Sequence, residues 1–242
     1  MIEKEIKIKT PDKYFIYGTL AKGKRSSPTL VILAHGLVGH QNEHIFFNGS
    51  KFLAKSNLDT FRFDFYSGDK GGRTMTDCGI STHVNDLNTV LKYFRPKYRQ
   101  VLVVGHSLGG MVVVSANLKL LDGIILWESS YNFYGENKLG FKYNKGLKAY
   151  VVSWGPEFLV SKKMADEWRT FPPIKNVASK ITVPLQVIVA GKGMLKKAGQ
   201  EYYKYAKGKK SFSTIAGAGH NFNELGTEEK LFSETLKFIK SL

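Results

Sequence analysis

The segment 101–114 places a serine where it could act as a nucleophile. An apolar run at 101–104 is followed by Gly105-His106-Ser107-Leu108-Gly109-Gly110 and then by a second apolar run at 111–114. This order is typical of a strand, a sharp turn and a helix, with the serine held clear of the sheet in a strained turn. We predict that Ser107 attacks an acyl carbonyl; the alternative is an ordinary glycine turn.

A histidine near the C-terminus has the surroundings of a catalytic base. His220 follows Ala216-Gly217-Ala218-Gly219, after the last predicted strand. Small neighbours would let its imidazole approach Ser107 and accept the hydroxyl proton. A surface histidine is the alternative. The other histidines lack the spacing of metal ligands, and we expect no metal and no cofactor.

Apolar β-branched runs alternate with amphipathic stretches, which is typical of a mostly parallel sheet with helices on both faces. The N-terminus should begin with an antiparallel pair of strands. Strands are predicted at 1–9, 14–20, 29–34, 60–64, 101–104, 123–127, 185–190 and 211–215. Helices are predicted at 46–56, after an N-cap at Ser81, behind Ser107 and at 228–242.

Residues 129–180 interrupt this alternation and are rich in aromatic residues and lysine. The stretch is too long for an ordinary connection. Its large aromatic residues are Phe133, Phe141, Trp154, Phe158, Trp168 and Phe171. We predict a lid inserted after the sixth strand of a single domain that spans residues 1–242; a long surface loop is the alternative.

Composition narrows the classes of protein further. The chain has 242 residues, 43% hydrophobic content, one cysteine and a formal charge of +16. Residues 138–210 hold 16 Lys and Arg against 4 Asp and Glu. These cations are dispersed, so we expect no nucleic-acid partner.

The first nine residues alternate apolar and charged, unlike a signal peptide, and no apolar run reaches the ~20 residues of a membrane span. A cytoplasmic location is expected.

The sequence resembles the α/β-hydrolase superfamily over nearly its whole length. Besides the serine turn, His35-Gly36, Arg62-Phe63-Asp64-Phe65 and Gly219-His220 fall in the family order. Among members the chain is most similar to compact bacterial esterases that include the cinnamoyl (feruloyl) esterases, with monoacylglycerol lipases and acyl thioesterases close by. The resemblance implies an α/β-hydrolase fold.

The resemblance also implies an oxyanion hole. In the family, a His-Gly pair such as His35-Gly36 shapes the oxyanion loop. By this likeness the backbone N–H groups of Leu37 and Leu108 would be the two donors.

The acid of the expected triad is missing from its usual place. Family members carry an Asp just after the strand at 185–190, where this chain has 191–197 without a carboxylate. The sixth strand instead ends in Glu128, similar to the haloalkane dehalogenases and some lipases. We predict the triad Ser107–His220–Glu128. The alternatives are Asp166 or Glu167 from the lid, a purely structural Glu128, or a site without its acid.

The leading hypothesis is a serine carboxylic-ester hydrolase that acts on a small aryl or acyl ester through an acyl-enzyme. An acyl thioesterase is the alternative within the enzyme class, because the basic bias could attract coenzyme A or an acidic carrier protein. A binding protein that has kept the fold without catalysis is the alternative from another class. The oligomeric state, a homodimer included, stays open.

Overall fold

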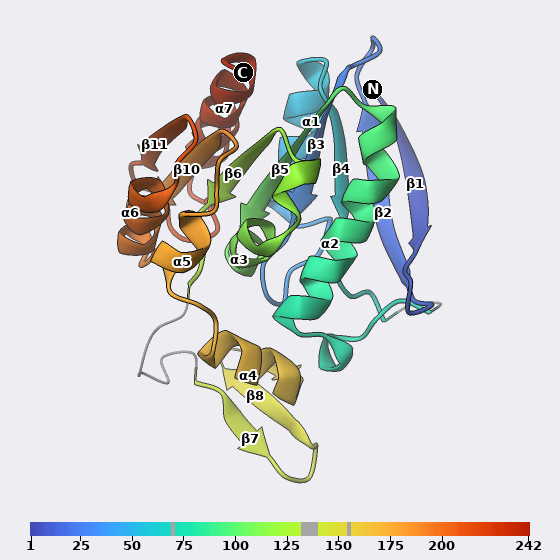
Figure 1. Cartoon of the computed structure of the whole chain (residues 1–242), viewed down its shortest axis with the longest axis vertical. Helices are drawn as coiled ribbons and strands as arrows, with labels where there is room; N and C mark the ends of the chain where they lie inside the picture. The colour runs from blue at the N-terminus through green and yellow to red at the C-terminus, as the bar shows by residue number, and fades with distance from the viewer. Residues whose placement is uncertain (69–70, 132–139, 154–155) are drawn as a thin grey trace.

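One eight-stranded sheet runs through the part of the chain that this computed structural model describes, residues 1–68, 71–131, 140–153 and 156–242 (Figure 1). Its strands are β1 (Ile2–Lys9), β2 (Phe15–Lys22), β3 (Thr29–Ala34), β4 (Asp59–Phe63), β5 (Gln100–His106), β6 (Gly123–Trp127), β10 (Leu185–Ala190) and β11 (Lys210–Ile215). They lie in the order β1-β2-β4-β3-β5-β6-β10-β11. β2 is antiparallel to β1 and β4, and the other neighbouring pairs are parallel. The predicted antiparallel start and mostly parallel sheet are confirmed.

Helices cover both faces of this sheet, as predicted. The helices are α1 (His44–Lys55), α2 (Ile80–Phe94), α3 (Leu108–Ser115), α4 (Lys162–Arg169), α5 (Ile174–Ala178), α6 (Lys196–Tyr205) and α7 (Thr227–Lys240), with 3-10 turns at Met75–Asp77, Arg95–Lys97 and Leu118–Leu120. Side chains alternate along each strand, and β3 is buried throughout. Val31 and Leu33 join one core with α1 and α7, whereas Leu30 and Ile32 join the other with α2, α3 and α6.

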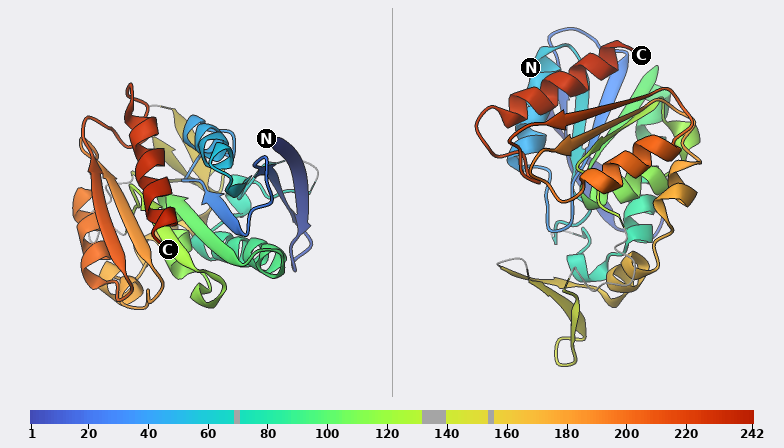
Figure 2. Two further views of the ribbon diagram at one scale, coloured as in Figure 1. Left: turned by 90° about the horizontal axis from the view of Figure 1, so that it is seen from above. Right: turned by 90° about the vertical axis from the view of Figure 1, so that its left-hand side faces the viewer.

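The segment between β6 and β10 holds a second, small sheet. Its strands are β7 (Lys142–Asn144), β8 (Ala149–Ser153) and β9 (Glu157–Val160), which pair antiparallel, and α4 follows them. The β7–β8 hairpin projects beyond the main sheet, on the side where β5 ends (Figures 1 and 2). Phe141, Trp168 and Phe171 are buried and continue the core of the main body, whereas Phe133 and Trp154 lie outside the described residues.

The start of α2 differs from the prediction. The helix begins at Ile80, and Gly79 rather than Ser81 is its N-cap. Ser81 instead donates its N–H and its hydroxyl to the Glu167 carboxylate on α4, at 2.8 and 2.6 Å. The Glu167 carboxylate on another helix thus accepts from an N–H group that a local capping residue would otherwise pair with. The spacing of residues in the sequence gives no indication of such a distant partner.

None of the described helices has both the length and the apolar character required to cross a membrane.

Gly109 should tolerate no side chain, because α3 crosses the end of β3 there. A Cβ on Gly109 would lie 2.3 Å from the Ala34 carbonyl oxygen, a backbone atom that cannot turn away. We expect Gly109→Ala to lower the free energy of unfolding by about 1–3 kcal/mol, measured by urea denaturation. Gly146→Ala is the control, since a Cβ there meets nothing closer than 3.4 Å. Equal stability of the two variants would contradict the close approach.

Candidate active site

Ser107 lies at the turn between β5 and α3 in a strained backbone conformation. Its φ is 52° and its ψ is −121°, a region that residues with a side chain rarely adopt. Neighbouring segments hold the turn: Ser107 N–H donates to the Trp127 carbonyl at 3.2 Å, and Ser130 N–H donates to the Ser107 carbonyl at 3.0 Å. Such strain persists only where the surroundings over-determine the backbone.

Two backbone N–H groups beside Ser107 have no hydrogen-bond acceptor among the described residues. Leu108 is the first residue of α3, so no preceding turn can accept from its N–H. Leu37 N–H is likewise unpaired in the loop after β3. That loop lies against the serine, because a Cβ on Gly36 would be 3.0 Å from Ser107 Cβ. The unpaired groups are those expected to form the oxyanion hole.

His35 holds this loop in place. Its Nε2 accepts from Phe65 N–H at 3.0 Å, and its Nδ1 lies 2.8 Å from the Gly36 carbonyl oxygen, to which it must donate. Burial lowers the pKa of His35 to about 4, so the ring is neutral at pH 7. Through these contacts the neutral His35 ring links the loop at Gly36 to the backbone of Phe65.

His220 lies in the loop after β11 and is partly buried. Burial lowers the pKa of its imidazole below the ordinary value, which favours the neutral form that a base requires. The loop is anchored by Phe222, which is fully buried and has a φ of 53°. Among the described residues the His220 ring accepts and donates no hydrogen bond.

His106 connects this loop to the serine turn, a contact that sequence reasoning missed. Its Nε2 donates to the His220 carbonyl at 2.9 Å, and the two rings lie with centroids 4.8 Å apart. Burial, followed by the neighbouring His220, lowers the pKa of His106 to about 3. The residue just before Ser107 therefore fixes the backbone of the residue predicted as its base.

Ser130 is a second residue that sequence reasoning missed. Its Oγ lies 3.1 Å from Ser107 Oγ, the hydrogen bond that the Ser107 hydroxyl makes within the described part of the chain. The Ser130 carbonyl accepts from Tyr202 OH at 3.0 Å, which fixes its position. Ser130 stands two residues after Glu128, but nothing in its local sequence distinguishes it.

Glu128 is fully buried at the end of β6, with a φ of 42°. Its Oε2 accepts from Ala190 N–H at 2.7 Å and its Oε1 from Leu195 N–H at 3.1 Å. Burial raises the pKa of the carboxyl, and these two amides oppose that rise. Within the described residues, Glu128 makes no hydrogen bond to His220.

Glu128 is nevertheless connected to the His220 loop through the loop that follows β10. The loop that binds its carboxylate carries Lys192, whose N–H donates to the Ala218 carbonyl at 2.8 Å, two residues before His220. The alternative acids are engaged elsewhere: Asp166 pairs with Lys162 and Arg169, and Glu167 binds Ser81.

A mostly parallel sheet with helices on both faces, and a strained serine between a strand and a helix, define the class of proteins that carry a nucleophile elbow. The chain matches the model of the alpha/beta hydrolase family over residues 31–229, and it belongs to that family. No curated protein matches it.

Solved structures with this fold include several esterases. Est1E from Butyrivibrio proteoclasticus with bound ferulic acid is 17% identical, with a TM-score of 0.81 and 98% of each chain covered. An esterase from Pyrococcus furiosus is 20% identical, with a TM-score of 0.73 and coverage of 99% of this chain and 92% of that one. The hydrolase GrgF from Penicillium sp. sh18 is 15% identical, with a TM-score of 0.80 and coverage of 100% and 99%. These likenesses show the shared fold.

The buried histidines should make the fold less stable in acid. A histidine in the unfolded chain has a pKa near 6.5, whereas burial holds the pKa of His35 at about 4 and that of His106 at about 3. As pH falls below about 6.5, the unfolded chain takes up protons that the folded chain does not, so stability is lost on acidification. We expect the urea midpoint to fall steadily between pH 7 and pH 5.

His106→Gln should make that pH dependence shallower, by up to ~1.4 kcal/mol per pH unit for the loss of one titrating group. Glutamine keeps an N–H donor for the His220 carbonyl. His40→Gln, at an exposed position, is the matched control and should leave the slope unchanged. Identical slopes in both variants would contradict the buried, neutral state of His106.

Proposed function

We propose that this chain is a serine carboxylic-ester hydrolase. The observation that carries the proposal is the strained Ser107 turn beside the two unpaired N–H groups of Leu37 and Leu108. Preorganised donors of this kind stabilise the negative charge that develops on a carbonyl oxygen under attack. Membership of a family of hydrolases supports the same reading.

In the proposed mechanism, the hydroxyl of Ser107 leaves its hydrogen bond with Ser130 and attacks the ester carbonyl carbon. His220 accepts the hydroxyl proton, and the N–H groups of Leu37 and Leu108 bind the tetrahedral oxyanion. The intermediate collapses as His220 returns the proton to the leaving alcohol. Water, activated by His220, then cleaves the acyl-enzyme and regenerates Ser107.

Glu128 is the proposed acid of the triad. Its support is a buried carboxylate on the strand next to β5, bound to the loop that contacts the His220 loop. In the substrate complex the carboxylate would also accept a hydrogen bond from His220 Nδ1, since a carboxylate has acceptor sites beyond its two amide contacts. Catalytic hydrogen bonds often tighten only in the complex, so the free state does not exclude this role.

A small aryl or acyl ester is the proposed substrate. Residues 129–180, which are rich in aromatic residues, would act as a lid that supplies apolar walls. Est1E binds ferulic acid, and the shared fold favours an aryl ester for this chain as well.

An acyl thioesterase is the second candidate, favoured by the excess of lysine in residues 138–210. Positive charge near the site would attract the phosphates of coenzyme A, an effect that salt screens. Comparing kcat/KM on p-nitrophenyl butyrate and butyryl-CoA at low and high salt separates the two. A higher, salt-sensitive value for the thioester would favour the thioesterase.

Ser107→Ala should abolish covalent labelling by a fluorophosphonate probe and lower kcat on p-nitrophenyl butyrate by at least ~10³-fold, because the nucleophile is lost. Gel fluorescence and initial rates measure the two effects. Ser115→Ala, on the same helix, is the control and should label normally. Wild-type protein that does not label would overturn the hydrolase proposal in favour of a binding protein.

Glu128→Gln should lower kcat by about 10³–10⁴-fold if Glu128 orients and stabilises the protonated His220. It should also shift the acid limb of the kcat/KM profile to lower pH, because a carboxylate no longer favours the imidazolium. A purely structural Glu128 would give a lower urea midpoint with kcat and the acid limb unchanged. That second pattern would remove Glu128 from the catalytic group.

A further inference from the structure

The β7–β8 hairpin carries positive charge that no acid in the described part of the chain pairs with. Lys142, Lys145 and Lys148 are exposed within it, and residues 140–153 contain no Asp or Glu. None of these lysines forms an ion pair with a described residue. On the neighbouring helix α4, by contrast, cations pair with the acids of the same helix, as in Lys162 with Asp166.

Apolar side chains are exposed among these lysines. Leu147 at the tip is 56% exposed and Tyr143 is 49% exposed. The turn is closed by a hydrogen bond in which the Asn144 side-chain oxygen accepts from Leu147 N–H at 3.1 Å. An exposed leucine held between lysines is suited to the boundary of a lipid layer, where apolar chains meet anionic headgroups.

Strand pairing extends this surface along the outer face of the small sheet. Lys142 is opposite Val151, and Val151 is opposite Leu159, which is 38% exposed. Cross-strand partners share a face, so these three lie together. The other face turns toward α4, where Arg169 donates to Tyr150 OH at 3.3 Å. The face with Lys142, Val151 and Leu159 is directed away from α4, whereas Tyr143, opposite Tyr150, lies on the α4 side.

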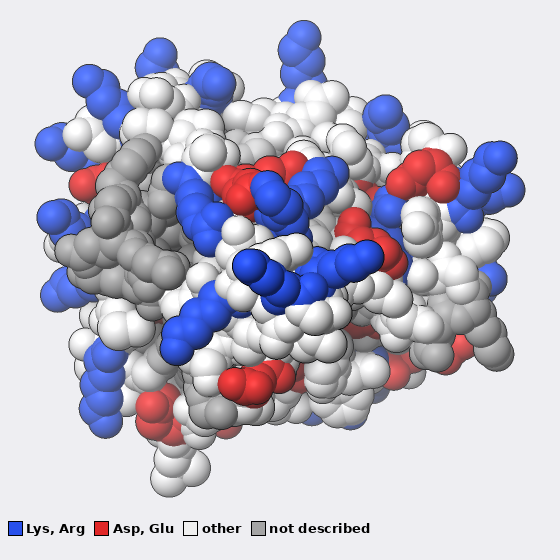
Figure 3. Space-filling model, turned by 90° about the horizontal axis from the view of Figure 1, so that it is seen from below, with Lys and Arg blue, Asp and Glu red and all other residues white. Residues whose placement is uncertain are grey.

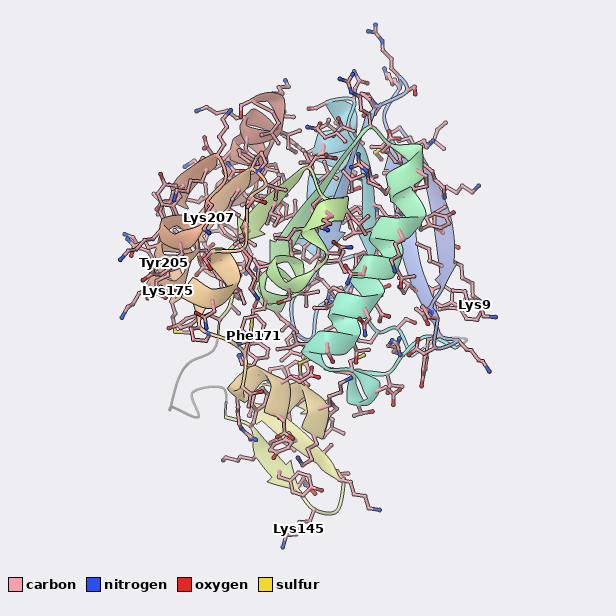
Figure 4. All side chains as sticks on the ribbon, in the orientation of Figure 1. Lys9, Lys145, Phe171, Lys175, Tyr205 and Lys207 are labelled. Atoms are coloured by element: carbon pink, nitrogen blue, oxygen red, sulfur yellow. The ribbon has the colours of Figure 1, made fainter. Side chains whose placement is uncertain are left out.

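The acidic residue in the described part of the small sheet, Glu157, lies far from the β7–β8 turn. Glu157 is opposite Ser153, at the end of β8 remote from the turn. Lys145 lies at the far extremity of the molecule (Figure 4), and Lys and Arg side chains gather on the face seen from that end (Figure 3). The charge is thus carried on a projection rather than in a hollow.

We propose that the β7–β8 hairpin docks the protein on an anionic lipid surface. A projecting tip needs no matching cavity in a bilayer, whereas a protein partner would have to supply one. Leu147 at the tip would enter the interfacial region while the three lysines contact anionic headgroups. Docking would bring the carboxyl end of the sheet, where Ser107 lies, toward the membrane. The binding does not depend on the proposed hydrolase activity.

Co-sedimentation with vesicles tests the proposal, with wild-type protein and Ser107→Ala run side by side so that catalysis plays no part. Both should bind phosphatidylcholine vesicles that contain phosphatidylglycerol, release them at high salt, and bind pure phosphatidylcholine weakly. Replacing Lys142, Lys145 and Lys148 together by Ala should lower the partition coefficient by on the order of 100-fold, at about fivefold for each lysine near the surface.

The matched control replaces Lys230, Lys237 and Lys240 on α7 by Ala, which removes the same charge at the opposite end of the molecule (Figure 1). It should bind as wild type does. Leu147→Ser should weaken binding without changing its salt dependence. Rates on a soluble ester and urea midpoints, measured on all variants, separate lost docking from lost folding or lost activity.

Three outcomes would overturn the proposal: no binding to the anionic vesicles, equal losses in the hairpin and α7 variants, or binding to polyglutamate, as a probe for an acidic protein partner, in place of vesicles. Equal losses would mean that net charge alone attracts the protein.

Discussion

The close approach of backbones around Ser107 is the constraint on which the site depends. A Cβ on Gly105 would lie 2.6 Å from the Gly109 carbonyl oxygen, and one on Gly110 would lie 2.1 Å from Ser129 Oγ. Because Gly105, Gly109 and Gly110 lack side chains, β5, α3, the end of β3 and the segment after β6 can pack together at one point. Interior packing tolerates little change of volume, so the position of the serine is determined by the whole group of elements.

The parts of the fold that could be predicted have strong local signals. β3 and β5 are apolar runs of the length of a buried strand, and the glycines around Ser107 mark the turn between β5 and α3. The small residues before His220 similarly indicate a loop. In each case, the residues that determine the structure are neighbours in the sequence, and their pattern is sufficient.

The parts that could not be predicted depend on contacts between distant segments. His106 binds a carbonyl 114 residues away, and Ser130 reaches Ser107 from 23 residues away. Ser81 fits the local pattern of a helix cap, but Glu167 on α4 meets it instead. The strands of the small sheet have three to five residues, too few for a periodicity to show. For Glu128, the end of β6 was predictable, whereas its amide partners depend on the path of the loop after β10.

That loop, residues 191–195, contacts the Glu128 carboxylate through one backbone amide, that of Leu195, beside the amide of Ala190 at the end of β10. Leu195 is buried, and a Cβ on Gly193 would lie 2.0 Å from Glu128 Oε1, but the side chains at 192 and 194 are exposed. Met194 is 90% exposed. Amides are common to almost all residue types, so positions such as 192 and 194 are free to diverge during evolution. The rim of the site on this side can therefore change its chemical character while the carboxylate beneath it stays in place.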